Sequence, residues 1–195
     1  CPYTADKARI VVQEMIDGIS LELVEKRLVT DQLVLTVGYD IENLTRPEIR
    51  KVYKGPVTTD RYGRRVPKHA HGTWNLSRAT SSSSELLEAM AALYDKIVNP
   101  ALLIRRMSLS ACHVVNEKMA KEREQKETFE QLDLFTDYAK REAKEKEEQK
   151  KRERERRMQE ALLTIKKKYG KNAVLRGMNF EEGATAKERN GQIGG

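Results

Sequence analysis

The sequence predicts an α+β fold in which two helices cover one face of a small sheet and a long charged helix follows as a tail. Apolar residues recur at helical spacing over 4–28 and 82–99, and strand-forming runs occupy 33–39, 72–80 and 102–115. Almost nothing apolar occurs in 138–157. We therefore expect a domain over 1–116, a linker over 117–137, a charged helix over 138–169 and an irregular tail over 170–195.

Composition limits the part of the chain that can form a core. Apolar residues make up 38% of the 195 residues and charged residues 34%, so much of the length must stay in solvent. The net charge of +7 favours an acidic partner such as nucleic acid. Two cysteines make no disulfide framework, and no signal peptide or long apolar run is visible, so we expect a cytoplasmic protein without membrane contact. Because the chain opens on Cys rather than Met, we expect a fragment of a longer protein.

The first helix and the first strand are predicted from two different spacings of apolar residues. Thr4 is a suitable N-cap for an amphipathic helix that runs to Leu28. The strand after it should place Leu33, Leu35 and Val37 toward the core, because side chains alternate along a strand.

Residues 41–68 form a long basic excursion. Val57–Thr59 and Arg64–Val66 flank the turn Asp60-Arg61-Tyr62-Gly63, which predicts a basic β-hairpin that ends at Pro67. Residues 46–68 hold eight Lys or Arg against two acidic residues, so +6 of the net +7 lies in this segment. Such a concentration favours phosphate contact, although a solvated loop remains the alternative for any single residue. The candidates for contact with the DNA backbone are Arg61, Arg64, Arg65 and Lys68.

A serine run opens the second helix. Ser82 and Glu85 are spaced as a capping box, and Pro100 follows the last turn. The free N–H groups and the dipole of a helix N-terminus attract a phosphate, and capping alone leaves Arg78 unexplained. We therefore expect phosphate contacts here, from Arg78, Thr80 and Ser81.

The third strand, within 102–115, alternates clearly. Apolar residues occupy the odd positions from Met107 to Ala111, and polar residues occupy the even positions from Arg106 to Ser110. One side should pack on helices while the other stays polar and basic. We expect Arg105 and Arg106 to contact phosphate, against the alternative of ordinary solvated arginines.

A short apolar motif lies between two charged stretches. Gln131-Leu132-Asp133-Leu134-Phe135 offers two leucines and an aromatic ring that can fill a pocket, while Gln131 adds an amide. It resembles the sliding-clamp-binding motif of bacterial DNA polymerases and mismatch-repair proteins. The alternative is one turn of an apolar-striped helix, but Leu134 and Phe135 lack partners at helical spacing downstream. We expect a sliding clamp as the partner of Gln131, Leu132, Asp133, Leu134 and Phe135.

The segment after this motif should form one solvated helix. Opposite charges four residues apart, such as Glu147 and Lys151, support an isolated helix, and the absence of a heptad seam argues against a coiled coil. A short amphipathic patch from Met158 to Tyr169 follows, and the rest of the chain should be irregular.

Six segments carry a family resemblance that covers essentially the whole chain: Thr30–Asp40, Lys68–Thr73, Thr80–Ser82, Thr128–Asp137, Lys168–Ala173 and Gln192–Gly195. They resemble the little-finger domain and tail of a Y-family translesion DNA polymerase, most closely the UmuC-like polymerases of Firmicutes. The resemblance implies a β-α-β-β-α-β layer with two helices on one face of a four-stranded sheet. The open face and its strand edges would grip DNA backbone in the major groove. The first strand would lie before Cys1-Pro2-Tyr3 and is largely missing.

The resemblance also implies the function. Residues up to about 116 would hold primer–template DNA without reading its sequence, and the motif at 131–135 would tether the polymerase to the sliding clamp during translesion synthesis in the SOS response. The palm, fingers and thumb are absent, so we expect neither catalysis nor a cofactor here, whereas the parent polymerase would use magnesium. The tail could bind other SOS or recombination proteins. The rival interpretation is a non-catalytic RNA-binding or adaptor module with a charged helix.

Three histidines and a cysteine raise the question of a zinc site. His69 and His71 would share one face of a strand, as metal ligands often do, and Cys112 and His113 are adjacent. No second close-spaced pair supports them, so we expect no metal and interpret His69 and His71 as polar residues near the DNA. Trp74, a lone strand aromatic, is expected to pack rather than to stack on a base.

Overall fold

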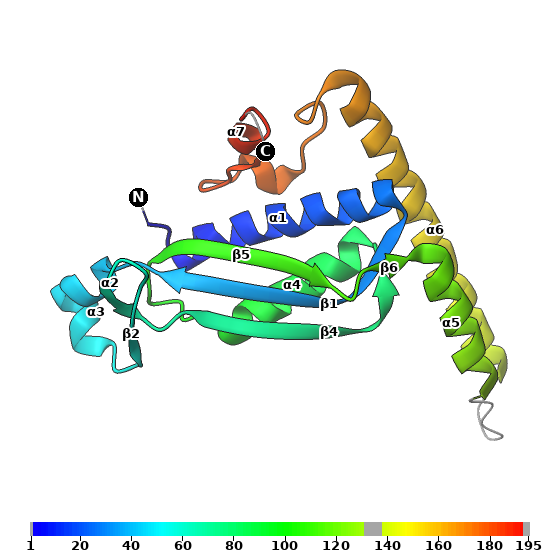
Figure 1. The fold of residues 1–195 in the computed structure, drawn as a ribbon. Coiled ribbons are helices and arrows are strands. Elements are labelled where there is room, and N and C mark those ends of the chain that lie inside the picture. Colours follow the sequence, from blue (N-terminus) through cyan, green and yellow to red (C-terminus); the bar gives the residue numbers. More distant parts are fainter. Residues whose placement is uncertain (1, 131–137, 193–195) are drawn as a thin grey trace.

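The computed structural model describes residues 2–130 and 138–192 and has an α+β fold, as the sequence predicts (Figure 1). In chain order the elements are α1 (Ala5–Lys26), β1 (Leu28–Tyr39), α2 (Glu42–Thr45), α3 (Pro47–Val52), β2 (Val57–Thr59), β3 (Arg65–Pro67), β4 (Ala70–Thr80), α4 (Ser83–Ile97), β5 (Ile104–Cys112), β6 (Val115–Asn116), α5 (Glu117–Glu130), α6 (Tyr138–Tyr169), the 3-10 helix η1 (Gly177–Phe180) and α7 (Ala186–Arg189). The two short helices α2 and α3 within the basic excursion were not predicted.

Strand β1 lies in the middle of an antiparallel sheet with the order β4-β1-β5, and β6 pairs with its first two residues. Leu35 at its centre lies opposite Gly72 on β4 and Leu109 on β5. In this register the apolar residues of all three long strands share one face. The chain enters α1 from the edge of this sheet, because Tyr3 and Ile104 exchange two backbone hydrogen bonds of 2.8 Å.

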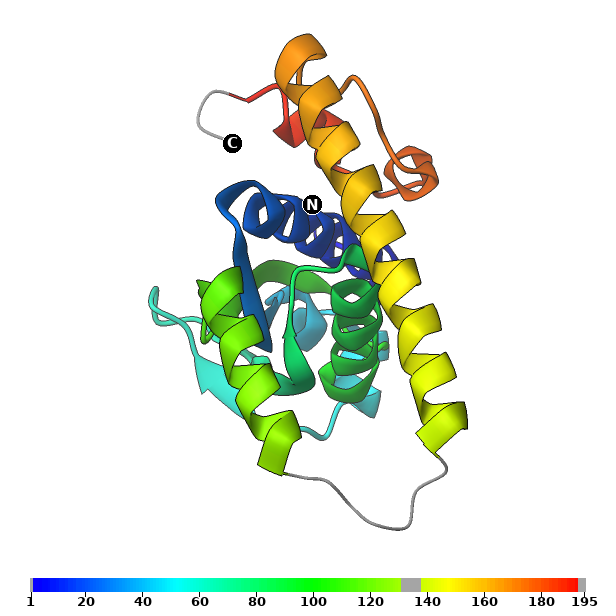
Figure 2. The ribbon, with the colours of Figure 1, turned by 90° about the vertical axis from the view of Figure 1, so that its right-hand side faces the viewer.

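Helices α1 and α4 cover the same face of the sheet (Figures 1 and 2). Leu33, Leu35 and Val37 are fully buried beneath them, together with Ile16 of α1 and Met90 of α4. Each of these side chains contributes roughly 1.5–3 kcal/mol through its removal from water. The predicted core side of β1 is therefore correct.

Two local contacts fix the helices in this layer. The buried Tyr94 hydroxyl on α4 donates a hydrogen bond of 2.7 Å to the Ala5 carbonyl at the start of α1. Burial raises the pKa of Tyr94. Helix α4 also approaches β4 closely at Gly72. A Cβ atom on this residue would lie 2.8 Å from Ile97 Cγ2 and 2.9 Å from Leu93 Cδ1. A residue without a side chain is what permits this close packing.

The opposite face of the sheet is polar and exposed. Its exposed side chains are His71, Thr73, Asn75 and Ser77 on β4 and Arg106, Ser108 and Ser110 on β5. Met107, Leu109 and Ala111 pack against the core instead, so the predicted alternation of the third strand is confirmed. Trp74 also packs against the core, as expected.

Two predictions about the charged region are wrong. The polar linker over 117–130 is helical, because its Glu and Lys residues are good helix formers and pair at four-residue spacing, as Glu117 and Lys121 do at 3.0 Å. Helix α6 is not isolated, because its C-terminal half lies against α1 and the start of α4; Lys167 there pairs with Glu25 at 2.8 Å. Of the predicted amphipathic patch, Met158, Ile165 and Tyr169 are exposed, whereas Leu162 is half-buried.

The segment after α6 is largely irregular, as predicted, but it lies against α1 (Figure 1). The Glu14 carboxylate of α1 accepts hydrogen bonds from Asn179 Nδ2 at 2.9 Å, from the Thr185 amide at 2.9 Å and from Arg189 Nη2 at 3.2 Å. Each hydrogen bond to a buried charged group stabilises this docking by about 1.5–3 kcal/mol. One buried glutamate therefore holds much of the tail in place.

Candidate nucleic-acid interface

The predicted hairpin is present as β2 and β3, and Asp60 holds its turn. The Asp60 amide donates to the Arg64 carbonyl at 2.9 Å, and Asp60 Oδ1 accepts from the Tyr62 and Arg64 amides at 2.8 and 2.9 Å. Gly63 takes the left-handed conformation, with φ of 77°. The hydrogen bond from the Arg64 amide is the main reason why the pKa of Asp60 is lowered, so the carboxylate that closes the turn stays ionised at neutral pH.

Asn43 fixes the basic excursion to the end of the sheet. This fully buried residue of α2 donates hydrogen bonds to the Asp40 carbonyl at 2.9 Å and the Leu103 carbonyl at 2.8 Å. Its Oδ1 accepts from the Leu103 amide at 2.7 Å. Helix α2 in turn packs against β3 of the hairpin. Asn43 was not predicted, because a single buried amide leaves no periodic signal in the sequence.

Both predicted arginines of β5 are exposed, and a β-bulge accounts for Arg105. Gly38 pairs with Arg106 and Tyr39 pairs with Ile104, so Arg105 is an extra residue on its strand. A bulge of this kind re-aims side chains that strict alternation would place on opposite faces. Arg106 is exposed on the open face by the regular alternation of the strand, and the bulge exposes Arg105 beside it, 3.8 Å from the carboxylate of Asp40.

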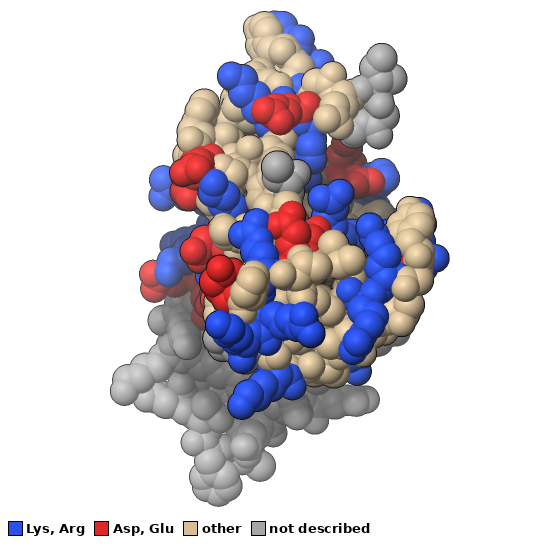
Figure 3. Space-filling model, turned by 90° about the vertical axis from the view of Figure 1, so that its left-hand side faces the viewer, with Lys and Arg blue, Asp and Glu red and all other residues tan. Residues whose placement is uncertain are grey.

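Positive charge gathers where the hairpin, α3 and the start of β5 meet, and Figure 3 shows this end of the molecule. We call it the basic end, and it comprises Arg46, Arg50, Lys51, Lys54, Arg61, Arg64, Arg65, Lys68, Arg105 and Arg106. Arg46 pairs with Glu42 and Arg64 with Asp60. Among the described side chains, no carboxylate pairs with the other cations except Arg105: Arg50, Lys51, Lys54, Arg61, Arg65, Lys68 and Arg106 are without one. His71 lies on the adjoining open face, 2.9 Å from the Thr36 hydroxyl.

The second predicted phosphate site lies at the opposite end of the sheet, where β4 ends and α4 begins. Thr80 and Ser81 are buried there, and Arg78 pairs with Glu85. Ser82 caps α4 as predicted by accepting from the Glu85 amide at 3.3 Å, while the Glu85 side chain turns to Arg78 instead of closing the capping box. The structure therefore does not bring Arg78, Thr80 and Ser81 together with the basic end.

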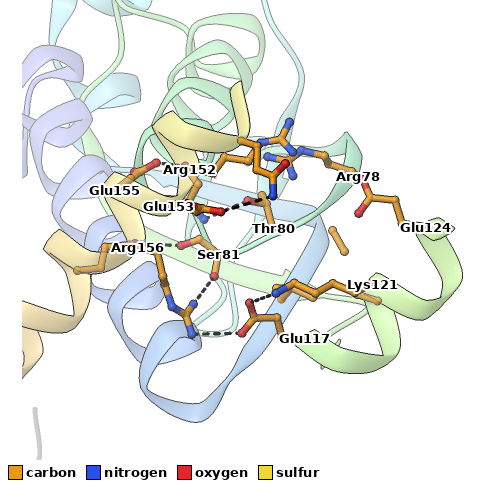
Figure 4. A pocket seen from close by; sticks show the side chains of 16 residues that line it. Arg78, Thr80, Ser81, Glu117, Lys121, Glu124, Arg152, Glu153, Glu155 and Arg156 are labelled. Carbon is orange, nitrogen blue, oxygen red and sulfur yellow. Dashed lines mark hydrogen bonds and ion pairs between the residues drawn. The ribbon is translucent and has the colours of Figure 1, made fainter. Parts of the chain in front are cut away.

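A carboxylate already occupies the N-terminus of α4. Glu155 of α6 accepts hydrogen bonds from the Ser84 amide at 2.8 Å, from the Ser82 hydroxyl at 2.6 Å and from the Ser84 hydroxyl at 2.9 Å. Arg156 donates to the Ser81 hydroxyl at 3.1 Å, as Figure 4 shows. The expectation of an anion at this helix N-terminus is physically sound, but here the anion comes from α6 of the same chain.

The pocket beside this contact is not suited to an anionic ligand. Its volume is about 350 Å³, and four basic and four acidic side chains line it: Arg78, Lys121, Arg152, Arg156, Glu117, Glu124, Glu153 and Glu155 (Figure 4). Burial alone would raise the pKa of Glu117, but the hydrogen bond from Lys121 and the charge of Arg156 hold it below its usual value. The charges in the pocket balance one another, so it serves to dock α6.

Gln159 is the buried centre of this docking, and its replacement tests the contact. Only 2% of it is exposed, and its Nε2 donates to the Ser81 carbonyl at 3.0 Å and the Ser83 hydroxyl at 2.9 Å. We expect Gln159→Ala to weaken the docking of α6 by about 1–3 kcal/mol, because two buried acceptors lose their donor. Hydrogen exchange of the amides over 155–169 should then accelerate. Met158→Ala, at an exposed position of the same helix, is the control, and unchanged exchange in Gln159→Ala would contradict this account.

The predicted clamp peptide, Gln131 to Phe135, lies outside the described residues. The helices before and after it are described, and Figure 1 shows that α5 leads away from the sheet while α6 returns to it. An ion pair of 3.2 Å between Arg156 and Glu117 joins the sheet-proximal parts of the two helices.

Comparison with known proteins gives no further guide, because the chain matches neither a protein-family model nor a curated protein. Within the described part of the chain, each helix lacks the length or the apolar character that a membrane crossing requires. The described His, Cys, Asp and Glu side chains form no group of three that could hold a metal ion. Instead, His113 Nδ1 lies 2.9 Å from Asp31 Oδ1, and His71 Nδ1 lies 2.9 Å from the Thr36 hydroxyl.

Proposed function

We propose that this chain is the DNA-gripping domain and tail of a Y-family translesion polymerase. It would bind primer–template DNA through phosphate contacts at the basic end and tether the polymerase to a sliding clamp through Gln131-Leu132-Asp133-Leu134-Phe135. The observation that carries the proposal is the basic end itself. Seven of its cations have no carboxylate partner among the described side chains, and an anionic polymer is the partner that would neutralise them.

The form of the domain supports the same proposal. Two helices cover one face of the antiparallel sheet, and the other face is left polar, with Arg106, Ser108 and Ser110 in a row along β5. Both features support the proposal, because the resemblance implies two helices on one face and an open face toward the DNA. Contacts from such side chains to phosphate oxygens carry no base information, which suits a polymerase that must accept damaged templates.

The tail supports the second half of the proposal. Tethering raises the effective concentration of a weakly gripping enzyme at the primer end, with no new contact to DNA. Helices α5 and α6 flank the peptide on both sides, and α6 is anchored on the domain through Glu155 and Gln159. A clamp bound to the peptide would thus stay joined to the DNA-binding domain by two helices.

A competition experiment separates this proposal from an RNA-binding adaptor. Labelled duplex DNA with a primer–template junction is bound to the protein and challenged with unlabelled duplex DNA or with structured RNA. We expect duplexes of unrelated sequence to compete equally well, because phosphate contacts carry no base information. Structured RNA should compete less well than DNA. A strong preference for structured RNA, together with no binding to the clamp, would favour the adaptor.

A further inference from the structure

One exposed aromatic side chain lies among the cations of the basic end. Tyr62 lies at the tip of the β2–β3 hairpin, where 66% of it is exposed. The other described aromatic residues with comparable exposure, Tyr169 and Phe180, belong to the tail rather than to the basic end. Tyr62 is thus the exposed aromatic ring that stands among the cations we assign to DNA.

The turn presents this ring from a fixed base. Asp60 accepts from the Tyr62 amide at 2.8 Å, and the Gly63 amide donates to the Asp60 carbonyl at 3.0 Å. Arg64 adds a side-chain hydrogen bond of 2.8 Å from its Nε to Asp60 Oδ2. These contacts order the backbone before any partner arrives, which lowers the entropic cost of binding through the tip.

Two guanidinium groups lie over the ring. The Cζ atoms of Arg61 and Arg64 lie 4.7 and 5.1 Å from the ring centroid of Tyr62. This arrangement keeps an aromatic face and two cations within one small surface. A nucleotide is complementary to that combination, because its base offers a π-face to the ring and its phosphate offers an anion to Arg61, whereas Arg64 is already paired with Asp60.

We propose that Tyr62 stacks on an unpaired nucleobase of the DNA, while Arg61 binds a neighbouring phosphate. The inference rests on the proposed function and adds the kind of DNA that the hairpin recognises. Neighbouring base pairs cover the faces of bases in a duplex, so a hairpin tip reaches only backbone and base edges there. A single-stranded template overhang leaves its base faces open, and one base–aromatic stack is sequence-tolerant.

The test compares two DNA probes, a primer–template with a single-stranded overhang and a blunt duplex of equal total length. Tyr62→Ala should weaken binding to the overhang probe about ten-fold, while its affinity for the blunt duplex changes less than about two-fold. Tyr62→Phe keeps the π-face and should retain the affinity of the unaltered protein. Tyr169→Ala is the matched control, because Tyr169 is equally exposed and also lies beside a cation, Lys168, at 5.1 Å, yet belongs to the tail.

Each other outcome overturns the inference. Equal losses on both probes would assign Tyr62 a role in hairpin structure or backbone binding, and no loss on the overhang probe would remove the ring from the contact. A loss in Tyr62→Phe as large as in Tyr62→Ala would assign the role to the hydroxyl. Failure of the unaltered protein to bind either probe would overturn the proposed function as well. Binding of the unaltered protein to the blunt duplex tests DNA binding separately from the role of Tyr62.

Discussion

Replacing Leu134 and Phe135 together by Ala is expected to abolish clamp binding while the affinity for DNA stays unchanged. The two side chains are the large apolar anchors of the peptide, and buried anchors of this kind each contribute about 2 kcal/mol or more. Loss of both should therefore weaken the complex on the order of 1,000-fold. A titration of the purified clamp, followed by calorimetry or fluorescence anisotropy, measures this directly.

The control for this variant removes two apolar side chains elsewhere in the tail. Met158 and Ile165 are exposed on α6, so Met158→Ala with Ile165→Ala deletes similar apolar surface without touching the peptide. We expect that double variant to bind the clamp like the unaltered protein. Equal clamp affinity for the Leu134/Phe135 variant and the unaltered protein would reject the peptide as the tether.

Neutralising three cations of the basic end is expected to have the second large effect. Arg65, Lys68 and Arg106 are exposed and pair with no described carboxylate, so their replacement by Gln breaks no ion pair among the described side chains. If each neutralises one phosphate, the slope of log affinity against log salt falls by about 0.9 for each residue. At about 0.1 M salt the affinity for duplex DNA should then drop several hundred-fold. Measurements of affinity across a salt series give both quantities.

A charge-matched control separates this effect from net charge alone. Lys150, Arg154 and Arg157 are exposed on one face of α6. Their replacement by Gln also removes three positive charges from the protein. This variant should keep the salt slope of the unaltered protein, because α6 lies at the other end of the sheet from the basic end. Equal losses for the two triple variants would mean that binding follows overall charge, and the basic end would lose its special role.

The layered core of this domain could be predicted from the sequence because it leaves periodic signals. Alternation identified Leu33, Leu35 and Val37 as buried, and the turn chemistry of Asp60 and Gly63 identified the hairpin. The polar composition of 117–130 predicts a linker, whereas its charged residues at four-residue spacing, such as Glu117 and Lys121, stabilise the helix α5.

The remaining features depend on contacts between residues that are far apart in the sequence. Gln159 buries its amide against Ser81, and Glu14 holds a tail segment more than 160 residues away, as its contact with Asn179 shows. Single polar residues of this kind have no period, so no window of sequence marks them. The exposure of Arg105 follows from a β-bulge, which depends on how two strands pair rather than on either strand alone.

One titration tests the central claim most directly, and it measures clamp binding and duplex binding side by side for three proteins: the unaltered chain, the Leu134/Phe135 variant and the Arg65/Lys68/Arg106 variant. We predict that the first variant loses the clamp and keeps the DNA, and that the second loses the DNA and keeps the clamp. Retention of both partners by both variants would contradict the assignment of DNA binding to the basic end and of clamp tethering to the peptide.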